Sequence, residues 1–158
     1  MNHYKIIRNI SGYTIALPFY ILFLILRLFL KRETATDLLR PAVKRYVALL
    51  AEITIIPQIN TSADFDKFMK KLKRNINFFK PLYDIGIQHE DGDKIILCYS
   101  NCPHCEAFLS LGLPELSKAA CDSDWVIADK NRDFWLFERN HQIGSGDMYC
   151  DHTYIRKD

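Results

Sequence analysis

Four of the five cysteines in this 158-residue chain are spaced in a way that suggests shared chemistry. The tetrapeptide Cys-Pro-His-Cys at 102–105 holds two of them, Cys121 comes 16 residues after Cys105, and Cys150 comes 29 residues after Cys121. A thiolate is both a nucleophile and a metal ligand, so three kinds of site compete. The fifth thiol, Cys98, lies within a strand-like segment, and we interpret it as a small buried apolar side chain.

The first interpretation is a thiol–disulfide exchange site. Cys102 and Cys105 at a helix N-terminus would include one thiol with a lowered pKa, which exchange chemistry needs. Disulfide oxidases of thioredoxin fold carry the same tetrapeptide, but that fold requires a βαβ unit around the motif and a cis-proline well downstream. Pro114, nine residues beyond Cys105, is the only later proline and is too close. The surrounding sequence therefore argues against this interpretation.

The second interpretation is a bound zinc ion. Cys102 and Cys105 have the spacing of a zinc knuckle, and Cys121 and Cys150 would complete a tetrahedral thiolate site. A mixed set is the alternative, in which Glu138 and His141 join Cys121 and Cys150. The second pair of thiols is widely split in the sequence, so the spacing leaves both ligand sets open.

The third interpretation is a nucleophilic cysteine. A thiolate from Cys102 or Cys105 would attack an electrophilic carbon, while His104 or Asp124 transfers the proton. The residue types alone do not separate this chemistry from zinc binding. The candidate catalytic residues are therefore Cys102, Cys105, Asp124 and His104, and the candidate zinc ligands are Cys102, Cys105, Cys121 and Cys150.

Several short motifs follow one another in a fixed order around these cysteines. They are Cys102-Pro103, Leu111-Gly112-Leu113-Pro114-Glu115-Leu116, Cys121-x-x-Asp124, Phe137-Glu138-Arg139 and Ile143-Gly144-x-Gly146-Asp147-x-x-Cys150-Asp151. In this order, over roughly residues 60–156, the chain resembles the L-2-amino-thiazoline-4-carboxylic acid hydrolase family.

The resemblance implies hydrolytic opening of a cyclic amidine-like ring at a C–N bond, which gives a carbamoyl-cysteine product. It also implies that the family's motif positions are occupied here by Cys102, Cys105, Cys121, Asp124 and Cys150. His152 departs from the pattern, since members usually carry an aromatic residue after Cys-Asp. A broader likeness to 4-vinyl-reductase-type domains implies the alternative, a non-catalytic module that senses a small molecule or zinc.

These residues must be positioned by the elements around them, and the first of these is a long apolar segment. No charged residue occurs from Asn9 to Leu26, and Ile10 to Leu30 is long enough to cross a bilayer if Arg27 extends toward the headgroups. No small-x-small cleavage site follows, which argues against a removed signal peptide. We expect a membrane anchor over residues 1–32; the alternative is a buried core helix.

Charges that flank this segment predict its orientation. The C-terminal side is the more basic, so the positive-inside rule places the rest of the chain in the cytoplasm, behind a single membrane span. Cysteines in that compartment are expected to be reduced. The basic residues between Lys67 and Lys80 suit a solvated helix face, or a face turned toward anionic lipid.

The pattern of the remaining sequence predicts helices followed by strands. Helices are expected from Thr36 to before Pro57 and from Ala63 to Phe79, where apolar residues recur at helical spacing. Strands are expected at 82–88, 94–100, 125–128, 133–139 and 148–155, with turns at Asp91-Gly92 and residues 144–146. The predicted fold class is α+β: a transmembrane helix and two further helices, then an antiparallel sheet that carries the cysteine-rich segment.

Length and composition limit the organisation and the partners. We divide the chain into an anchor at 1–32, a connecting helix at 33–59 and a hydrolase-like domain at 60–158. A net charge of +2 gives no indication of nucleic-acid binding. The expected partners are a small-molecule substrate or ligand and membrane lipid.

Overall fold

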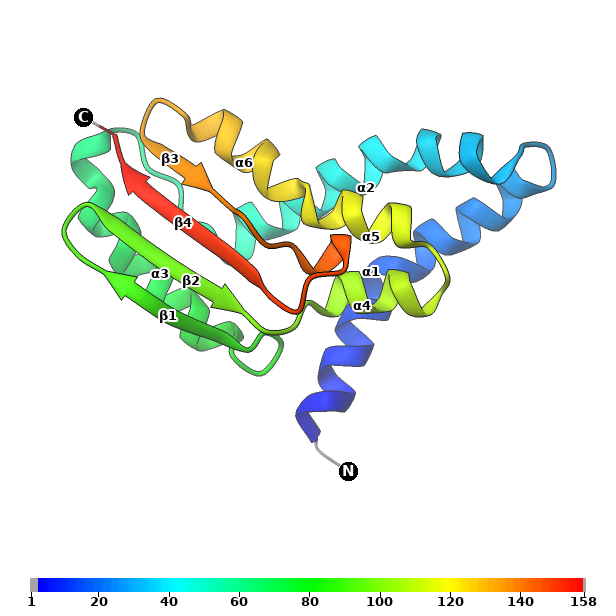
Figure 1. Cartoon of the computed structure of the whole chain (residues 1–158), viewed down its shortest axis with the longest axis horizontal. Helices are drawn as coiled ribbons and strands as arrows, with labels where there is room; N and C mark the ends of the chain where they lie inside the picture. Colours follow the sequence, from blue (N-terminus) through cyan, green and yellow to red (C-terminus); the bar gives the residue numbers. More distant parts are fainter. Residues whose placement is uncertain (1–2, 158) are drawn as a thin grey trace.

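A computed structural model describes residues 3–157 and shows an α+β fold, as predicted (Figure 1). A four-stranded antiparallel sheet lies beside a group of helices, and one further helix covers a face of the sheet. In chain order the elements are α1 (His3–Arg27), α2 (Arg32–Thr54), η1 (Ser62–Asp64), α3 (Phe65–Phe79), β1 (Ile85–Glu90), β2 (Lys94–Tyr99), α4 (Pro103–Ser110), α5 (Pro114–Cys121), α6 (Ser123–Asn131), β3 (Trp135–Glu138), η2 (Ile143–Ser145) and β4 (Cys150–Arg156).

The sheet has the strand order β1-β2-β4-β3, so the last strand of the chain lies in its interior. β1 and β2 form the predicted hairpin, and its turn is closed by the Asp91 carboxylate, which accepts the backbone N–H of Asp93 at 2.9 Å. β4 pairs with β2 so that Cys150 lies opposite Tyr99. Because side chains alternate between the two faces of a strand, Cys150, His152 and Tyr154 share one face of β4.

Helix α3 supplies the apolar layer under the sheet. Its buried side chains are Phe65, Phe68, Met69, Leu72 and Ile76, which confirms the helical spacing seen in the sequence. The ring of Phe68 lies 5.6 Å from that of Trp135 and 5.4 Å from that of Tyr154, so α3 contacts both β3 and β4. The lysines of α3 are on its outer side, where they remain hydrated.

Three short helices, α4 to α6, occupy the connection between β2 and β3. The prediction of a strand at 125–128 was wrong, since these residues belong to α6. The run Trp-Val-Ile favours a strand by residue type. Asp124 in the first turn and Lys130 in the last turn complement the helix dipole, and the side chain of Ile127 is buried in the core. Tertiary packing thus outweighs the local preference.

Helices α1 and α2 form an antiparallel pair that projects from the helical half of the molecule (Figure 1). One side of α1 is packed, through Gly12, Ile15, Ala16 and Phe23. Gly12 lies so close to α4 that a Cβ there would be 2.2 Å from the carbonyl oxygen of Pro103. α1 is therefore fitted tightly onto the helix that carries the Cys-Pro-His-Cys motif.

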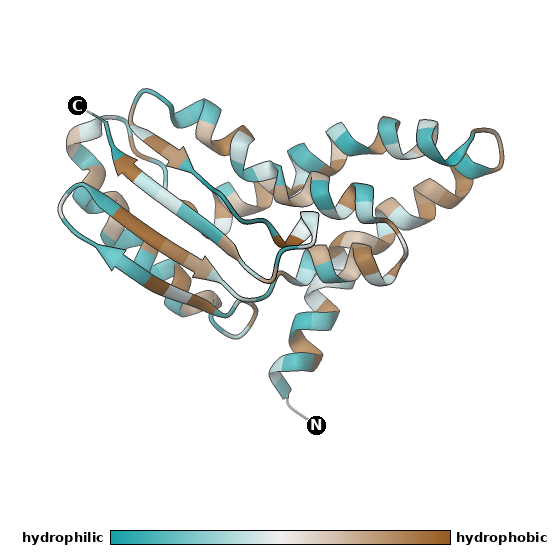
Figure 2. Cartoon of the chain, viewed as in Figure 1, coloured by the Kyte–Doolittle hydropathy of each residue, from teal (hydrophilic) through white to brown (hydrophobic). Residues whose placement is uncertain are grey.

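The other side of α1 is exposed and apolar. Figure 2 shows hydrophobic residues along the second half of α1 and in the turn to α2. Within residues 3–157, α1 is the one helix that is long and apolar enough to cross a membrane. The exposed apolar residues of α1 and of the turn include Leu17, Ile21, Leu24, Ile25, Leu28 and Phe29.

The α3–sheet layer leads to a stability prediction. Phe68→Ala should lower the free energy of unfolding by about 3–5 kcal/mol, because a fully buried ring between three aromatic neighbours is removed. Lys70→Glu, on the exposed side of the same helix, should change it by less than about 0.5 kcal/mol. Denaturant titration of the full chain in detergent measures both values, and equal losses would contradict the assigned face.

A candidate thiol active site

The predicted cysteines surround a small cavity of about 70 Å³ between α2, the end of the sheet and α4 to α6. One wall is apolar and comes from α2 and the residues after it, namely Val47, Ala51, Ile55 and Ile56. The opposite walls carry the reactive groups Cys102, His104, Cys121, Asp124, Cys150 and His152, together with Tyr83, Tyr99, Ala120 and Ser123. A closed apolar wall facing several polar groups is typical of a small-molecule site.

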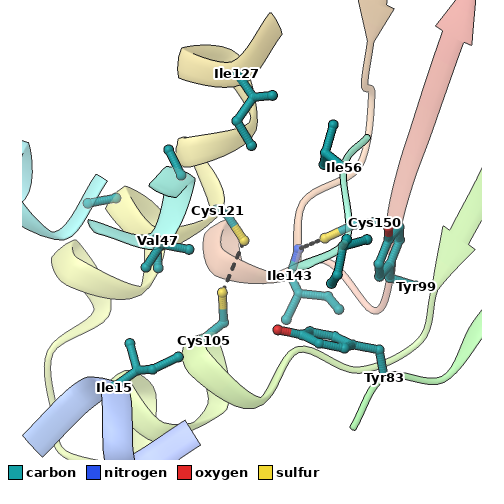
Figure 3. Packing of buried hydrophobic residues seen from close by; sticks show 14 of the residues in the cluster. Ile15, Val47, Ile56, Tyr83, Tyr99, Cys105, Cys121, Ile127, Ile143 and Cys150 are labelled. Carbon is teal, nitrogen blue, oxygen red and sulfur yellow. Dashed lines mark hydrogen bonds between the residues drawn. The ribbon is translucent and has the colours of Figure 1, made fainter. Parts of the chain in front are cut away.

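Four thiols converge here from the start of α4, the end of α5 and the start of β4, and three of them, Cys102, Cys121 and Cys150, line the cavity. Cys102 is the residue before α4, Cys105 lies in its first turn, Cys121 ends α5, and Cys150 begins β4. The sulfurs of Cys105 and Cys121 are 3.1 Å apart and point at each other (Figure 3). The strand pairing that sets Cys150 opposite Tyr99 brings the last thiol to the same end of the sheet.

Backbone N–H groups of η2 donate hydrogen bonds to two of these sulfurs. Gly144 donates to Cys121 Sγ and Ile143 donates to Cys150 Sγ, each at 3.2 Å. The chain must come very close to do so, since a Cβ on Gly144 would lie 2.7 Å from Cys121 Sγ. Gly146 then reverses the chain with a φ of 103°, which favours glycine. The Gly-x-Gly motif is thus explained by the sulfurs behind it.

Hydrogen bonding concentrates negative charge on one of the four thiols. Hydrogen bonds from the thiols of Cys105 and Cys121 lower the pKa of Cys102 to about 5. Hydrogen bonds with Cys102 and Cys121 raise the pKa of Cys105 well above its usual value. A hydrogen bond with Cys121 likewise raises the pKa of Cys150. Cys102 also lies at the N-terminus of α4, where the helix dipole favours an anion. Cys102 is therefore the candidate nucleophile.

Asp124 is the carboxylate of the cavity. Its Oδ2 accepts a hydrogen bond from Nη1 of Arg139 at 2.8 Å and lies 3.5 Å from Nε2 of His152. Arg139 is itself buried, with its side chain 2% exposed, and also donates to the carbonyl oxygen of Cys121. This guanidinium fixes the carboxylate in place beside the thiols, where it can accept or return a proton.

His104 lies next to Cys102 and is held by one ring nitrogen. Its Nε2 forms a short hydrogen bond with the Tyr83 hydroxyl, while its buried Nδ1 has no protein partner among residues 3–157. Burial lowers the pKa of His104 to about 4, so the ring is neutral at physiological pH. A neutral imidazole with a free nitrogen can hydrogen-bond a bound molecule.

Other candidate residues lie elsewhere. Glu138 and His141 are exposed and are not among the residues that line the cavity. His141 stacks on Tyr149 instead, with ring centroids 4.5 Å apart. Cys98 pairs with Asp151 between β2 and β4, and its side chain alternates away from Tyr99.

Several residues of the cavity had no signal in the sequence. Tyr99 reaches the thiols through the pairing of β2 with β4, and Tyr83 lies just before β1; both line the cavity. Arg139 belongs to a motif quoted above, but the motif does not reveal that its guanidinium bonds Asp124. The pairing of a buried arginine side chain with a partly buried aspartate is visible only in the fold.

The zinc hypothesis requires the thiols to converge on one point. Two sulfurs bound to one zinc ion at about 2.3 Å in a tetrahedral site lie about 3.8 Å apart. The 3.1 Å between Cys105 and Cys121 is instead a thiol–thiol hydrogen-bond distance. Within residues 3–157, no group of three or more His, Cys, Asp or Glu side chains is arranged to hold a metal ion. Zinc binding stays a prediction.

The close approach of η2 leads to a second prediction. Gly144→Ala should destabilise the protein by about 1–3 kcal/mol and disturb the thiols, because the added methyl group meets Cys121 Sγ and Ser117 O, each at 2.7 Å. Gly86→Ala in β1 has nothing within 4 Å of the new methyl group and should be tolerated. Thermal unfolding and thiol titration compare the two, and a neutral Gly144→Ala would contradict the geometry.

Two comparisons with known proteins bear on the family of this chain. A search of curated proteins found no match. A family model for L-2-amino-thiazoline-4-carboxylic acid hydrolase matches residues 15–154, from the middle of α1 into β4. The match includes all four thiols, Asp124 and Arg139, and so spans the whole cavity. The chain therefore belongs to the L-2-amino-thiazoline-4-carboxylic acid hydrolase family.

Proposed function

We propose that this protein is a membrane-anchored hydrolase that opens a small cyclic amidine, such as L-2-amino-thiazoline-4-carboxylate, at its ring C–N bond. The observation that carries the proposal is Cys102, a thiol with a lowered pKa at the start of α4 that lines the same cavity as Asp124. Membership of the family supports a hydrolase-like activity on a small molecule.

The cavity residues support a two-step reaction. The Cys102 thiolate adds to the amidine carbon, the ring C–N bond breaks, and the released nitrogen takes up one proton from solvent water, which the neutral imidazole of His104 relays. Water then adds to the same carbon, Asp124 accepts its proton, and the Cys102 thiolate leaves. Asp124 returns that proton to solvent, which restores the starting state. The product keeps the ring sulfur, now bearing a carbamoyl group, and a free amine. The net change is addition of one water molecule.

Activity measurements test the catalytic assignment. Cys102→Ser should lower hydrolysis of L-2-amino-thiazoline-4-carboxylate at least about 100-fold, since the hydroxyl is a far weaker nucleophile at neutral pH. Asp124→Asn should cost about 10²- to 10⁴-fold by removing the proton acceptor. Cys98→Ser, outside the cavity, should stay within about twofold of wild type. Mass spectrometry of substrate and carbamoyl product provides the rates.

The alternative, a zinc or small-molecule sensor without turnover, is tested on the same samples. Elemental analysis of anaerobically purified wild type and Cys121→Ser shows whether the thiols hold zinc. Measuring the binding of unreacted aminothiazoline shows whether a ligand occupies the cavity without being hydrolysed. Stoichiometric zinc that disappears in Cys121→Ser, together with no hydrolysis by wild type, would replace the enzyme proposal with the sensor.

The membrane part of the proposal assigns α1 as the anchor. One side of α1 packs on α4, and the exposed side is apolar over Leu17, Ile21, Leu24 and Ile25, as lipid contact requires. Arg27, Lys31 and Arg32 follow at its C-terminal end. This distribution of charge favours a cytoplasmic location for the C-terminal end of α1. Because α4 packs on the other side of the same helix, the proposal assigns lipid contact to the exposed apolar side of α1.

Fractionation tests the anchor. The wild-type chain should remain in the membrane pellet after alkaline carbonate extraction, and a cytoplasmic reporter fused after Asp158 should be active. Ile21→Asp, on the exposed side of α1, should release a substantial fraction, because a carboxylate in a membrane helix costs about 2.5–3.5 kcal/mol. Ile53→Asp, equally exposed but on α2, should not. Wild-type protein in the soluble fraction would contradict the assignment.

A further inference from the structure

A second cavity of about 190 Å³ lies between α1, α2 and the end of α3, directly beside the thiol cavity. It has five lining residues in common with that cavity: Val47, Ala51, Ile55, Tyr83 and His104. Its own walls come from Ser11 and Ile15 of α1, Leu50 and Thr54 of α2, and Phe79 and Leu82. The two spaces therefore adjoin, with these five residues bordering both. Figure 3 shows two of the five, Val47 and Tyr83, and Ile15 of α1 beyond Cys105.

The lining of this second cavity differs in chemistry from that of the first. It contains neither a thiol nor a carboxylate. The Thr54 hydroxyl is already used, since it donates to the Leu50 carbonyl oxygen at 2.5 Å, and the Tyr83 hydroxyl is bonded to Nε2 of His104. The Ser11 hydroxyl and Nδ1 of His104 are the other polar side-chain atoms of the lining. What remains is mostly apolar, so the space suits an alkyl group rather than a charged one.

The position of this cavity relates it to the membrane. Its α1 wall is formed by the packed side of the helix whose other side is exposed and apolar. The same helix therefore borders the apolar cavity on one side and, as the proposed anchor, lipid on the other. This step rests on the proposed function, because it takes α1 as the membrane anchor and Cys102 as the nucleophile.

We propose that the natural substrate is an amphiphile, with a compact electrophilic head in the thiol cavity and an unbranched alkyl tail in the cavity between α1 and α2. The head meets Cys102 and Asp124, while the tail lies along Ile15, Leu50 and Phe79. The tail cavity gives the anchor a role in substrate selection, since α1 both contacts lipid and forms one of its walls.

Alkyl-maleimides of two lengths test this inference on the full chain in phospholipid nanodiscs. All variants carry Cys98→Ser, so that only the cavity thiols react. The measured quantity is the ratio of the modification rate with N-octylmaleimide to that with N-methylmaleimide, which cancels any change in thiol reactivity. The protein with the open tail cavity should have a ratio about tenfold or more above that of variants in which a side chain fills this cavity. Filling removes the space in which the octyl chain would be buried.

Ser11→Phe and Thr54→Phe fill the tail cavity from its two helices, and either should reduce the ratio. Leu17→Phe adds similar bulk to the exposed side of α1 and should keep it, which controls for accumulation of the octyl reagent in lipid. A ratio unchanged by both filling variants, with folding verified by circular dichroism, would overturn the inference. Its failure would leave hydrolysis of the short aminothiazoline by Cys102 intact. A fully active Cys102→Ser would instead contradict the proposed function and remove the nucleophile on which this inference rests.

Discussion

The pairing of β2 with β4 is the constraint on which the candidate site depends. β2 ends at Tyr99 and the chain enters α4 four residues later, at Pro103, while β4 begins at Cys150, opposite Tyr99. The two ends of the cysteine-rich segment are therefore held together by backbone hydrogen bonds of the sheet. The same register stacks the ring of His152 on that of Tyr99, with centroids 4.4 Å apart. A slip by one residue would turn Cys150 and His152 to the opposite face.

Placing four thiols, three of them buried, near a carboxylate raises an electrostatic problem, which the surrounding donors solve. Negative charge in a cavity is costly unless donors surround it. The N-terminal end of α4 favours the anion at Cys102, the guanidinium of Arg139 pairs with Asp124, and the N–H groups of Ile143 and Gly144 donate to the sulfurs of Cys150 and Cys121. All four are fixed by secondary structure or by burial, so they need no rearrangement when charge develops. Such fixed donors are the usual basis of electrostatic catalysis.

Much of the fold was predictable from the sequence, because its elements have strong local signals. The apolar spacing of Phe65, Phe68 and Leu72 indicated α3, and Asp91-Gly92 indicated the hairpin. The α6 helix was missed, since its Trp-Val-Ile run has strand preference and only packing in the helical layer decides it. Cys102, Cys121 and Cys150 were candidates from their types and motif order, and all three line the cavity. Their tyrosine neighbours, the Asp124–Arg139 pair and the apolar cavity depend on contacts between distant segments, which no local pattern encodes.

The contact of Gly12 with Pro103 has a practical consequence for work with this protein. A backbone atom next to the candidate nucleophile is covered by α1, and Ile15 and Ala16 of the same helix belong to the common core. A shortened chain without α1 would be easier to purify, but it would expose Phe108 and Ala107 of α4 to water and would open one side of the cysteine helix. Kinetic constants from such a fragment would describe an altered site. Solubilisation with lipid or detergent keeps the first helix and so keeps the geometry of the cysteines.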